Sequence, residues 1–338
     1  MGKPLVAVVD WKPQPRGDRK CLVEKEAIGS VADVKYFLCD KLEDWKGQVL
    51  KADAILVWHN TKITEEVIHK LENCKAIVRN GTGYDTVDHI AAGMADISFS
   101  NVPDYGVDEV ADHSIALALN LCRQILSTHE ECKQLNWDME SCHKIRRFNQ
   151  MNFGVIGLGR IGGAVALKAK ALGFKVCFYD PYIRNGTEKT FGISRFKNFN
   201  EFISMMDVIS INCPLTDETR YMFTKKEFNK MSKNAFLVNT ARGPIVKKAD
   251  LFEALNKKQI AGAAFDVFED EPLKTKKEAS TPNLIMTSHS AFYSKQSMYD
   301  MRYTGASIAK DILQGKKPEN CINCEYLPSN WLKNRMNP

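Results

Sequence analysis

Three charged residues stand where apolar runs give way to loops, and their types suit one kind of chemistry. Arg242 follows the run FLVNTARG, Glu271 ends the run AAFDVFEDEP before its proline, and His289 follows LIMTSH. An arginine pairs bidentately with a carboxylate and polarises a neighbouring keto oxygen. A histidine delivers a proton to that oxygen as hydride arrives, while a carboxylate orients the imidazole and favours its protonated form. The combination suggests hydride transfer to a 2-keto acid.

Each of these residues also has an ordinary interpretation when it is taken alone. Arg242 could be a surface arginine, Glu271 a solvated acid in the run EDE, and His289 a histidine satisfied within its loop. Their shared position favours the functional interpretation, because ligands of open α/β sheets bind at the carboxyl ends of the strands. The interpretation therefore depends on a nucleotide-binding α/β fold.

The sequence contains a dinucleotide-binding fingerprint, which predicts such a fold. The apolar run at residues 153–156 ends in VIGLGRIG, a G-x-G-x-x-G that opens the amphipathic stretch 161–172. A second apolar run, 175–179, closes on Asp180. Strand, glycine turn, helix, strand and acid form the dinucleotide-binding pattern, in which the helix N-terminus receives the pyrophosphate. The alternative is a structural βαβ unit that binds no nucleotide.

The acid at the end of the fingerprint indicates which nicotinamide cofactor binds. Asp180 is expected to accept hydrogen bonds from the ribose hydroxyls and to repel a 2′-phosphate, which favours NAD over NADP. Lys175 begins the second run and Arg184 follows the acid, so NADP stays a disfavoured alternative.

Apolar runs alternate with helical patterns along the chain, and this alternation predicts parallel, helix-covered sheets. Runs of strand type cover residues 4–10, 34–39, 54–59, 76–79, 98–101, 153–156, 175–179, 208–212, 235–239, 262–267 and 284–287. Helical patterns cover residues 22–30, 45–51, 64–72, 88–93, 107–128, 161–172, 199–205, 225–230, 249–257 and 297–315.

We expect an α/β fold with two doubly wound parallel-sheet domains. Residues 104–293 would form a Rossmann NAD-binding domain. Residues 1–103 with 294–338 would form a flavodoxin-like substrate domain, and the active site would lie in the cleft between the two. The pattern at residues 107–128 is apolar over a wide face, so this helix would bridge the domains or lie against a second subunit. Residues 134–150 are polar, and we expect them to form an irregular segment that leads to the fingerprint strand.

Composition narrows the class of protein. The 338 residues carry Lys+Arg 47 and Asp+Glu 41, a net charge of +6 that is spread along the chain. Such a mild excess suits small anions and argues against nucleic acid as a direct partner. No apolar run is long enough for a membrane helix, and the N-terminus reads as a strand rather than a signal peptide.

The cysteines indicate a reducing compartment. Ten of them are scattered along the chain, and only Cys321 and Cys324 form a C-x-x-C. No second pair or nearby histidine accompanies that motif, so we expect neither a metal site nor a redox function there. A cytoplasmic location is the simplest interpretation.

Several longer motifs resemble one enzyme family over nearly the whole chain. NGTGYDTVD, VPDYGVDEVADH, VIGLGRIG, NTARG, AAFDVFEDEP and SHSAFYS resemble the D-2-hydroxyacid dehydrogenases, the family that includes phosphoglycerate and formate dehydrogenases. Within the family, RNGTGYD, KAKALGFKVCFYDPY and HSAFYSKQS are most similar to the branch of the C-terminal-binding-protein corepressors.

The resemblance assigns roles to individual positions. It implies that Arg242, Glu271 and His289 are the catalytic triad. It implies cofactor contacts from Thr82, Ile156, Gly157, Leu158, Gly159, Arg160, Ile161, Asp180, Cys213, Thr219, Thr240 and Asp266. It implies substrate contacts from Arg79, Phe292 and the backbone of Thr82 and Gly83. Two positions depart from the family pattern: Phe292 replaces a tryptophan of the corepressor branch, and Ser288 replaces the usual proline before the histidine.

Arg79 bears most on the choice of substrate. The alternative for this residue is a surface arginine that ends a strand. A side chain that faces the site would add a second cation and favour a keto acid with another anionic or polar group, including phosphohydroxy acids and phosphonates.

These observations predict an NAD-dependent oxidoreductase that interconverts a 2-keto acid and a D-2-hydroxy acid, and that forms a homodimer. The alternative is an NAD(H)-sensing, corepressor-like dimer that binds peptides. The long C-terminal extension common in animal corepressors is missing from this sequence, which favours the enzyme.

Overall fold

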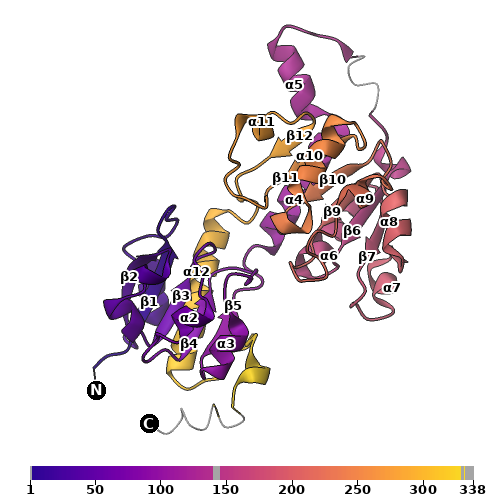
Figure 1. Ribbon diagram of the computed structural model, residues 1–338. Coiled ribbons are helices and arrows are strands. Elements are labelled where there is room, and N and C mark those ends of the chain that lie inside the picture. Colours follow the sequence, from indigo (N-terminus) through magenta and orange to yellow (C-terminus); the bar gives the residue numbers. More distant parts are fainter. Residues whose placement is uncertain (1, 140–144, 329–330, 332–338) are drawn as a thin grey trace. The chain divides into compact units, whose positions relative to one another are not determined.

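The computed structural model describes residues 2–139, 145–328 and 331, and the chain divides into two compact units (Figure 1). Unit 1 consists of Met1–Gly106 and Ser294–Pro338, and unit 2 of Val107–Tyr293.

Unit 1 is built on a five-stranded sheet whose strands are all parallel. Its order is β2-β1-β3-β4-β5, which is the flavodoxin-like doubly wound order. The strands are β1 (Leu5–Trp11), β2 (Asp33–Cys39), β3 (Ala54–Val57), β4 (Ala76–Arg79) and β5 (Ser98–Asn101). Strands β3 and β4 are buried at every position, as expected for central strands covered on both faces.

Helices cover both faces of the unit 1 sheet. One face packs against α1 (Leu22–Ile28) and α12 (Lys295–Leu313), which brings the C-terminal part of the chain back to unit 1. The other face packs against α2 (Glu65–Ile68), α3 (His89–Met94) and the 3₁₀ helix η2 (Gly47–Lys51). Two further 3₁₀ helices are η1 (Leu42–Asp44) and η6 (Cys324–Tyr326).

Unit 2 contains a seven-stranded parallel sheet in the order β12-β11-β10-β9-β6-β7-β8. The strands are β6 (Asn152–Ile156), β7 (Lys175–Tyr179), β8 (Ser194–Phe196), β9 (Val208–Ile211), β10 (Phe236–Asn239), β11 (Gly262–Phe265) and β12 (Leu284–Met286). The chain starts in the middle at β6, runs outward to β8 and returns to the other side at β9. This reversal is the topological switch point at which a Rossmann sheet binds its ligand.

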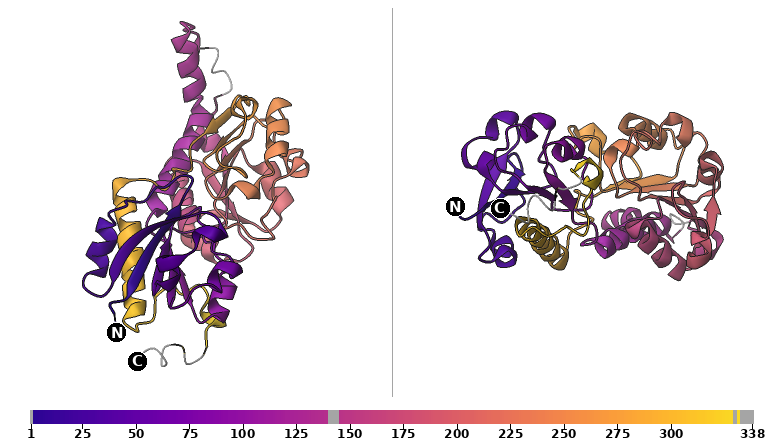
Figure 2. Two further views of the ribbon diagram at one scale, coloured as in Figure 1. Left: turned by 60° about the vertical axis from the view of Figure 1, so that its left-hand side comes forward. Right: turned by 90° about the horizontal axis from the view of Figure 1, so that it is seen from below.

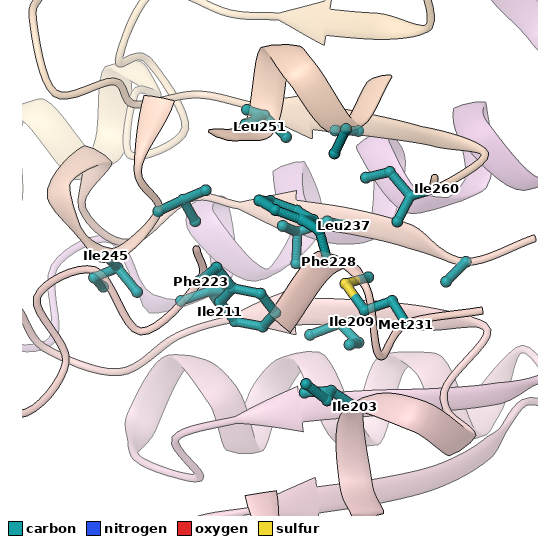
Figure 3. Close-up of a cluster of buried hydrophobic side chains, with 14 of the residues drawn as sticks. Ile203, Ile209, Ile211, Phe223, Phe228, Met231, Leu237, Ile245, Leu251 and Ile260 are labelled. Carbon is teal, nitrogen blue, oxygen red and sulfur yellow. The ribbon is translucent and has the colours of Figure 1, made fainter. Parts of the chain in front are cut away.

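The helices of unit 2 cover both faces of its sheet, and Figure 3 shows part of the core on one face. One layer contains α8 (Phe199–Met205), α9 (Lys225–Phe228) and α10 (Lys248–Asn256), and the opposite layer contains α4 (Val107–Arg123) and α6 (Arg160–Ala171). The remaining elements are α5 (Ile125–Lys133), α7 (Thr187–Phe191), α11 (Lys276–Ala279), η4 (Phe148–Gln150) and η5 (Gly243–Ile245).

The expected fold class of two doubly wound parallel-sheet domains is confirmed, with local differences. The single helix expected over residues 107–128 is wrong: Gln124 adopts a φ of 53° and separates α4 from α5. Figures 1 and 2 both show α5 projecting away from the sheet of unit 2. The strand β8 and the short helices α7 and α11 were not predicted. Part of the polar stretch at 134–150, residues 140–144, lies outside the described residues.

Three further observations bear on the expectations from composition. Cys321 and Cys324 are joined by a disulfide, whereas the sequence favoured thiols in a reducing compartment. None of the helices in the described part of the chain combines the length and apolar content needed to span a bilayer. Among the described residues, no three His, Cys, Asp or Glu side chains gather where they could hold a metal ion.

Candidate active site

The glycine turn after β6 has the shape that a dinucleotide needs. Gly157 has a φ of +83°, and a Cβ at this position would lie 2.8 Å from the backbone of Cys213. A Cβ on Gly162 would lie 1.9 Å from the carbonyl oxygen of Gly157. Only glycines allow this close approach of the turn to its helix and to the loop after β9. Among the described residues, no atom beyond its chain neighbours lies within 4 Å of a Cβ built on Gly159, the residue before α6, so the N-terminus of this helix has room for a pyrophosphate.

Asp180 closes this turn at the carboxyl end of β7. Its Oδ2 accepts a hydrogen bond from the backbone N–H of Leu158 at 2.9 Å, and its Oδ1 accepts one from Tyr182 N–H at 2.9 Å. Arg195 of β8 donates to the Asp180 carbonyl at 2.9 Å. The carboxylate is therefore held beside the glycine turn, where the fingerprint requires the acid that binds ribose hydroxyls. The residues present fit a dinucleotide.

The other cofactor candidates of unit 2 surround the same end of the sheet. Ile156 ends β6, Leu158 and Gly159 lie in the turn, and Arg160 and Ile161 begin α6. Cys213 is buried after β9, and this burial raises the pKa of its thiol to about 12, which keeps it neutral. The Thr219 hydroxyl donates to the Pro214 carbonyl at 2.7 Å and shapes the loop after β9. Thr240 follows β10 and shares a hydrogen bond with Ser114 at 2.7 Å.

Glu271 and His289 are joined directly. The Nδ1 atom of His289 lies 2.7 Å from Oε2 of Glu271, and Phe268 N–H donates to the other carboxylate oxygen at 3.0 Å. The two side chains come from the loops after β11 and β12, which are neighbouring strands. Both side chains are partly exposed, so the pair is accessible to a small molecule.

Arg242 lies in the next loop of the sheet, after β10. Its Nη1 donates to the Ala241 carbonyl at 2.8 Å, and its own carbonyl accepts from the Asn239 side chain at 3.0 Å. A Cβ on Gly243 would lie 1.9 Å from the carbonyl carbon of Phe268. This glycine therefore lets the Arg242 loop pack onto the segment that leads to Glu271. The loops of all three triad candidates follow consecutive strands at one edge of the sheet.

The loop that carries His289 has an unusual backbone. His289 adopts a φ of 53°, in the left-handed region that costs a non-glycine residue free energy. Its ring lies edge-on to Phe292, with centroids 6.3 Å apart and an interplanar angle of 83°. Phe292 therefore borders the histidine, whereas its role as an aromatic wall toward a substrate stays a prediction.

The substrate candidates of unit 1 follow β4. Arg79 is only 6% exposed, so it is not a surface arginine, and its Nη1 donates to the Asn80 carbonyl at 2.6 Å. The Thr82 carbonyl accepts from the Asn101 side chain at 2.6 Å, and Gly83 is partly buried. These contacts define the local structure of the RNGTG segment, whereas the roles of Arg79, Thr82 and Gly83 toward a substrate stay predictions.

Sequence reasoning missed several residues that support this site. His113 and Thr287 bond to each other beside the His289 loop, and Gly243 brings two loops together. Lys248 holds the segment before Glu271, since its N–H donates to Glu269 at 2.5 Å and its Nζ to Asp270 at 3.0 Å. In the sequence, Gly243 directly after the predicted Arg242 could have indicated that another backbone segment approaches closely at this position.

Comparison with known proteins identifies the family to which the chain belongs. Residues 115–291 match the model of the D-isomer specific 2-hydroxyacid dehydrogenase, NAD binding domain. The chain belongs to the D-2-hydroxyacid dehydrogenase family. D-3-phosphoglycerate dehydrogenase of Methanocaldococcus jannaschii is 34% identical to it over 290 residues, which cover 86% of this chain and 55% of that protein.

Two other proteins are also similar to this chain. C-terminal-binding protein 1 of Caenorhabditis elegans is 31% identical over 341 residues, covering 97% of this chain and 46% of that protein. The chain thus spans about half the length of the curated relatives it matches. A crystal structure of D-lactate dehydrogenase from Aquifex aeolicus, complexed with NAD and lactic acid, superposes with a TM-score of 0.84 at 27% identity, covering 94% of this chain and 99% of that one.

Proposed function

We propose that this dehydrogenase-family chain is an NAD-dependent oxidoreductase that interconverts a 2-keto acid and a D-2-hydroxy acid. The observation that carries the proposal is the 2.7 Å contact between Glu271 and His289. Glu271 and His289 follow β11 and β12, and β11 pairs with β10, the strand that precedes Arg242. All three loops lie in the unit that matches an NAD-binding domain. Proton donor, orienting carboxylate and carboxylate-binding cation are the three groups that the reaction needs.

The residues of unit 2 have separate roles in the proposed reaction. The glycine turn receives the cofactor's pyrophosphate and Asp180 its ribose hydroxyls, which favours NAD over NADP. The bound cofactor supplies or accepts the hydride. Arg242 binds the substrate carboxylate. Because Nδ1 of His289 is bonded to Glu271, Nε2 is the atom that gives the proton to the keto oxygen, or removes it in reverse.

The residues after β4 set the choice of substrate in this proposal. The backbone N–H groups of Thr82 and Gly83 bind the substrate carboxylate, and Arg79 adds a second cation. A buried arginine favours a keto acid that carries a further anionic or polar group. A phosphohydroxy acid or a phosphonate is the alternative substrate, and the similarity to a D-3-phosphoglycerate dehydrogenase supports the first of these.

The two expected domains have separate roles in this proposal: residues 104–293 form the NAD-binding domain, and residues 1–103 with 294–338 form the substrate domain. The protein is a cytoplasmic homodimer. Residues 125–137, which comprise α5 and the segment directly after it, support the dimer. They carry exposed apolar side chains at Ile125, Leu126, Leu135 and Trp137, and Trp137 is 88% exposed. Such side chains favour burial against a second copy. Sedimentation of wild type and of Trp137→Ala, which is expected to weaken the dimer, tests this assignment.

One observation favours a second candidate function, namely the similarity to C-terminal-binding protein 1 over 97% of this chain. In this alternative the protein senses NAD(H) and binds peptides of the Pro-x-Asp-Leu-Ser type. A sensor would bind NADH but turn over sluggishly on every keto acid. Fluorescence titration with such a peptide, beside a scrambled peptide, separates the two candidates.

A substrate screen tests the enzyme. Pyruvate, bulkier keto acids and phosphorylated keto acids are supplied with NADH, and oxidation is followed by absorbance. We expect turnover of at least one acid by wild type and near loss of that turnover in Arg242→Ala and His289→Ala. Full activity of His289→Ala would remove the histidine from the role of proton donor.

A further inference from the structure

A hydrogen-bonded chain leads from helix α4 to the loop of His289. We propose that His113, acting through Thr287, is a positioning residue that holds His289 in its working orientation. This inference rests on the proposed function, in which His289 is the proton donor. It assigns a role to a second histidine that the triad does not include.

The direction of the hydrogen bonds follows from their chemistry. The Thr287 hydroxyl lies 2.5 Å from Oδ1 of Asp266, and a carboxylate can only accept, so the hydroxyl donates its one hydrogen there. Nε2 of His113 lies 3.0 Å from the same hydroxyl oxygen. With its hydrogen committed, that oxygen must accept from His113, which therefore carries a proton on Nε2.

Asp266 is the point to which the loop of residues 287–291 is attached. It is only 2% exposed, and its carboxylate also accepts the N–H groups of Ser290 and Ala291, each at 2.9 Å. Its carbonyl accepts the N–H of His289 at 2.9 Å. The backbone on both sides of the imidazole is thus bonded to one buried aspartate.

The loop needs such an attachment for two reasons. His289 sits at a φ of 53°, which persists only where surrounding contacts hold it. The residue before it is Ser288, which lacks the fixed φ that a proline would impose there. The hydrogen bond that His113 donates and those that Asp266 accepts supply the restraint instead.

Helix α4 is a suitable base because it is packed on several sides. It buries Ala111, Ile115 and Ala118 in the core that it shares with α6 and with the strand residues Val238 and Ala264. The residue after His113, Ser114, bonds to Thr240, two positions before Arg242. One turn of α4 therefore holds the loops of both the proton donor and the carboxylate-binding arginine.

Matched substitutions test the chain of bonds. Thr287→Val removes the hydroxyl at constant shape, and Thr287→Ser keeps it. His113→Leu removes the Nε2 donor, and His113→Gln places an amide N–H near the same point. We expect Thr287→Val and His113→Leu to lower kcat about 10- to 100-fold, the scale of a misplaced catalytic group. Thr287→Ser and His113→Gln should recover most of it. Thermal unfolding confirms that each variant is folded.

Two further measurements distinguish a loss of His289 positioning from weaker cofactor binding and from a general loss of structure in unit 2. The dissociation constant of NADH, from fluorescence titration, should stay near the wild-type value in all four variants. Deuterium uptake by the peptide covering residues 284–293 should rise in Thr287→Val and His113→Leu, with the other peptides of unit 2 unchanged. Wild-type uptake in those two variants would overturn the proposal, as would a loss of NADH affinity that matches the loss of kcat.

The same experiment distinguishes failure of the underlying function. If wild type turns over no keto acid, the proposed function fails, and deuterium uptake alone decides whether His113 and Thr287 hold the loop. If wild type is active while Thr287→Val and His113→Leu keep full kcat, the positioning role fails and the proposed function stands.

Discussion

Nδ1 of His289 and Oε2 of Glu271 lie 2.7 Å apart, at the ends of neighbouring strands. Because Phe268 N–H fixes the other carboxylate oxygen, the glutamate is oriented by the backbone of its own loop. The imidazole therefore meets a carboxylate whose direction is set before any substrate binds.

This geometry predicts the effect of Glu271→Gln. The glutamine keeps the size of the side chain but removes the charge that stabilises a protonated imidazole. We expect keto-acid-dependent oxidation of NADH to fall about 100-fold in kcat, within the range of general acid–base contributions. NADH affinity, measured by fluorescence, serves as the control and should be unchanged. Wild-type kcat in this variant would remove Glu271 from the mechanism.

A second prediction concerns cofactor choice. Asp180→Ala removes the carboxylate beside the glycine turn, which is bonded to Leu158 N–H. Loss of charge-assisted bonds to ribose should weaken NADH binding about 10- to 100-fold. Loss of the negative charge should raise the relative use of NADPH. The kcat/KM ratio of the two cofactors measures this, and an unchanged ratio would show that Asp180 does not select between them.

The residues that sequence reasoning located share a local signature. Strands β4 (Ala76–Arg79) and β7 (Lys175–Tyr179) have the bounds expected from their apolar runs. The triad candidates were found because each lies within four residues of the end of such a run. By contrast β8, Ser194–Phe196, is a three-residue edge strand with no apolar periodicity, so nothing in its composition marked it.

What sequence reasoning missed depends on distant parts of the chain. His113 and Thr287 are 174 positions apart, and no local pattern indicates which helix packs beside which loop.

The break between α4 and α5 was missed for a different, local reason. It rests on a positive φ at Gln124, and glutamine rarely adopts a positive φ. A helical pattern that continues on both sides conceals such a break.

A third prediction concerns the stability of unit 1. Arg302 of α12 donates two hydrogen bonds of 2.7 Å to Glu24 of α1, whose side chain is 1% exposed. Arg302→Met leaves the buried Glu24 carboxylate without its counterion, and Glu24→Leu leaves Arg302 with only its longer contact to Asp18, at 3.5 Å. Glu24→Leu or Arg302→Met alone should lower the free energy of unfolding by about 3–5 kcal/mol.

The double variant provides the control for the ion pair. Glu24→Leu with Arg302→Met removes both charges and should be more stable than either single variant. Urea unfolding followed by circular dichroism gives the three values. Additive losses in the double variant would contradict a direct ion pair.

A fourth prediction concerns acid stability near the Glu271 loop. The hydrogen bond from Lys248, at 2.8 Å, is the largest cause that lowers the pKa of Glu278 from 4.5 to about 2. A lowered folded-state pKa means that the fold favours the ionised form. This stabilisation is present above pH 4.5 and is lost as the pH falls toward about 2.

Melting temperatures of wild type and Glu278→Gln across this pH range test whether the ionised form of Glu278 stabilises the fold. Wild type should melt higher at neutral pH, and the two curves should converge as the pH approaches 2. A difference that stays constant across the range would show that the ionisation of Glu278 contributes nothing to stability.

The central claim is that hydride and proton reach a 2-keto acid at the site of Arg242 and His289. It is tested most directly by incubating the protein with NADH and the best acid of the screen, then separating the product on a chiral column. We predict D-2-hydroxy acid in equal molar amount to the NAD formed, and almost none with His289→Ala. NADH that binds tightly while no tested acid yields a hydroxy acid would contradict the claim.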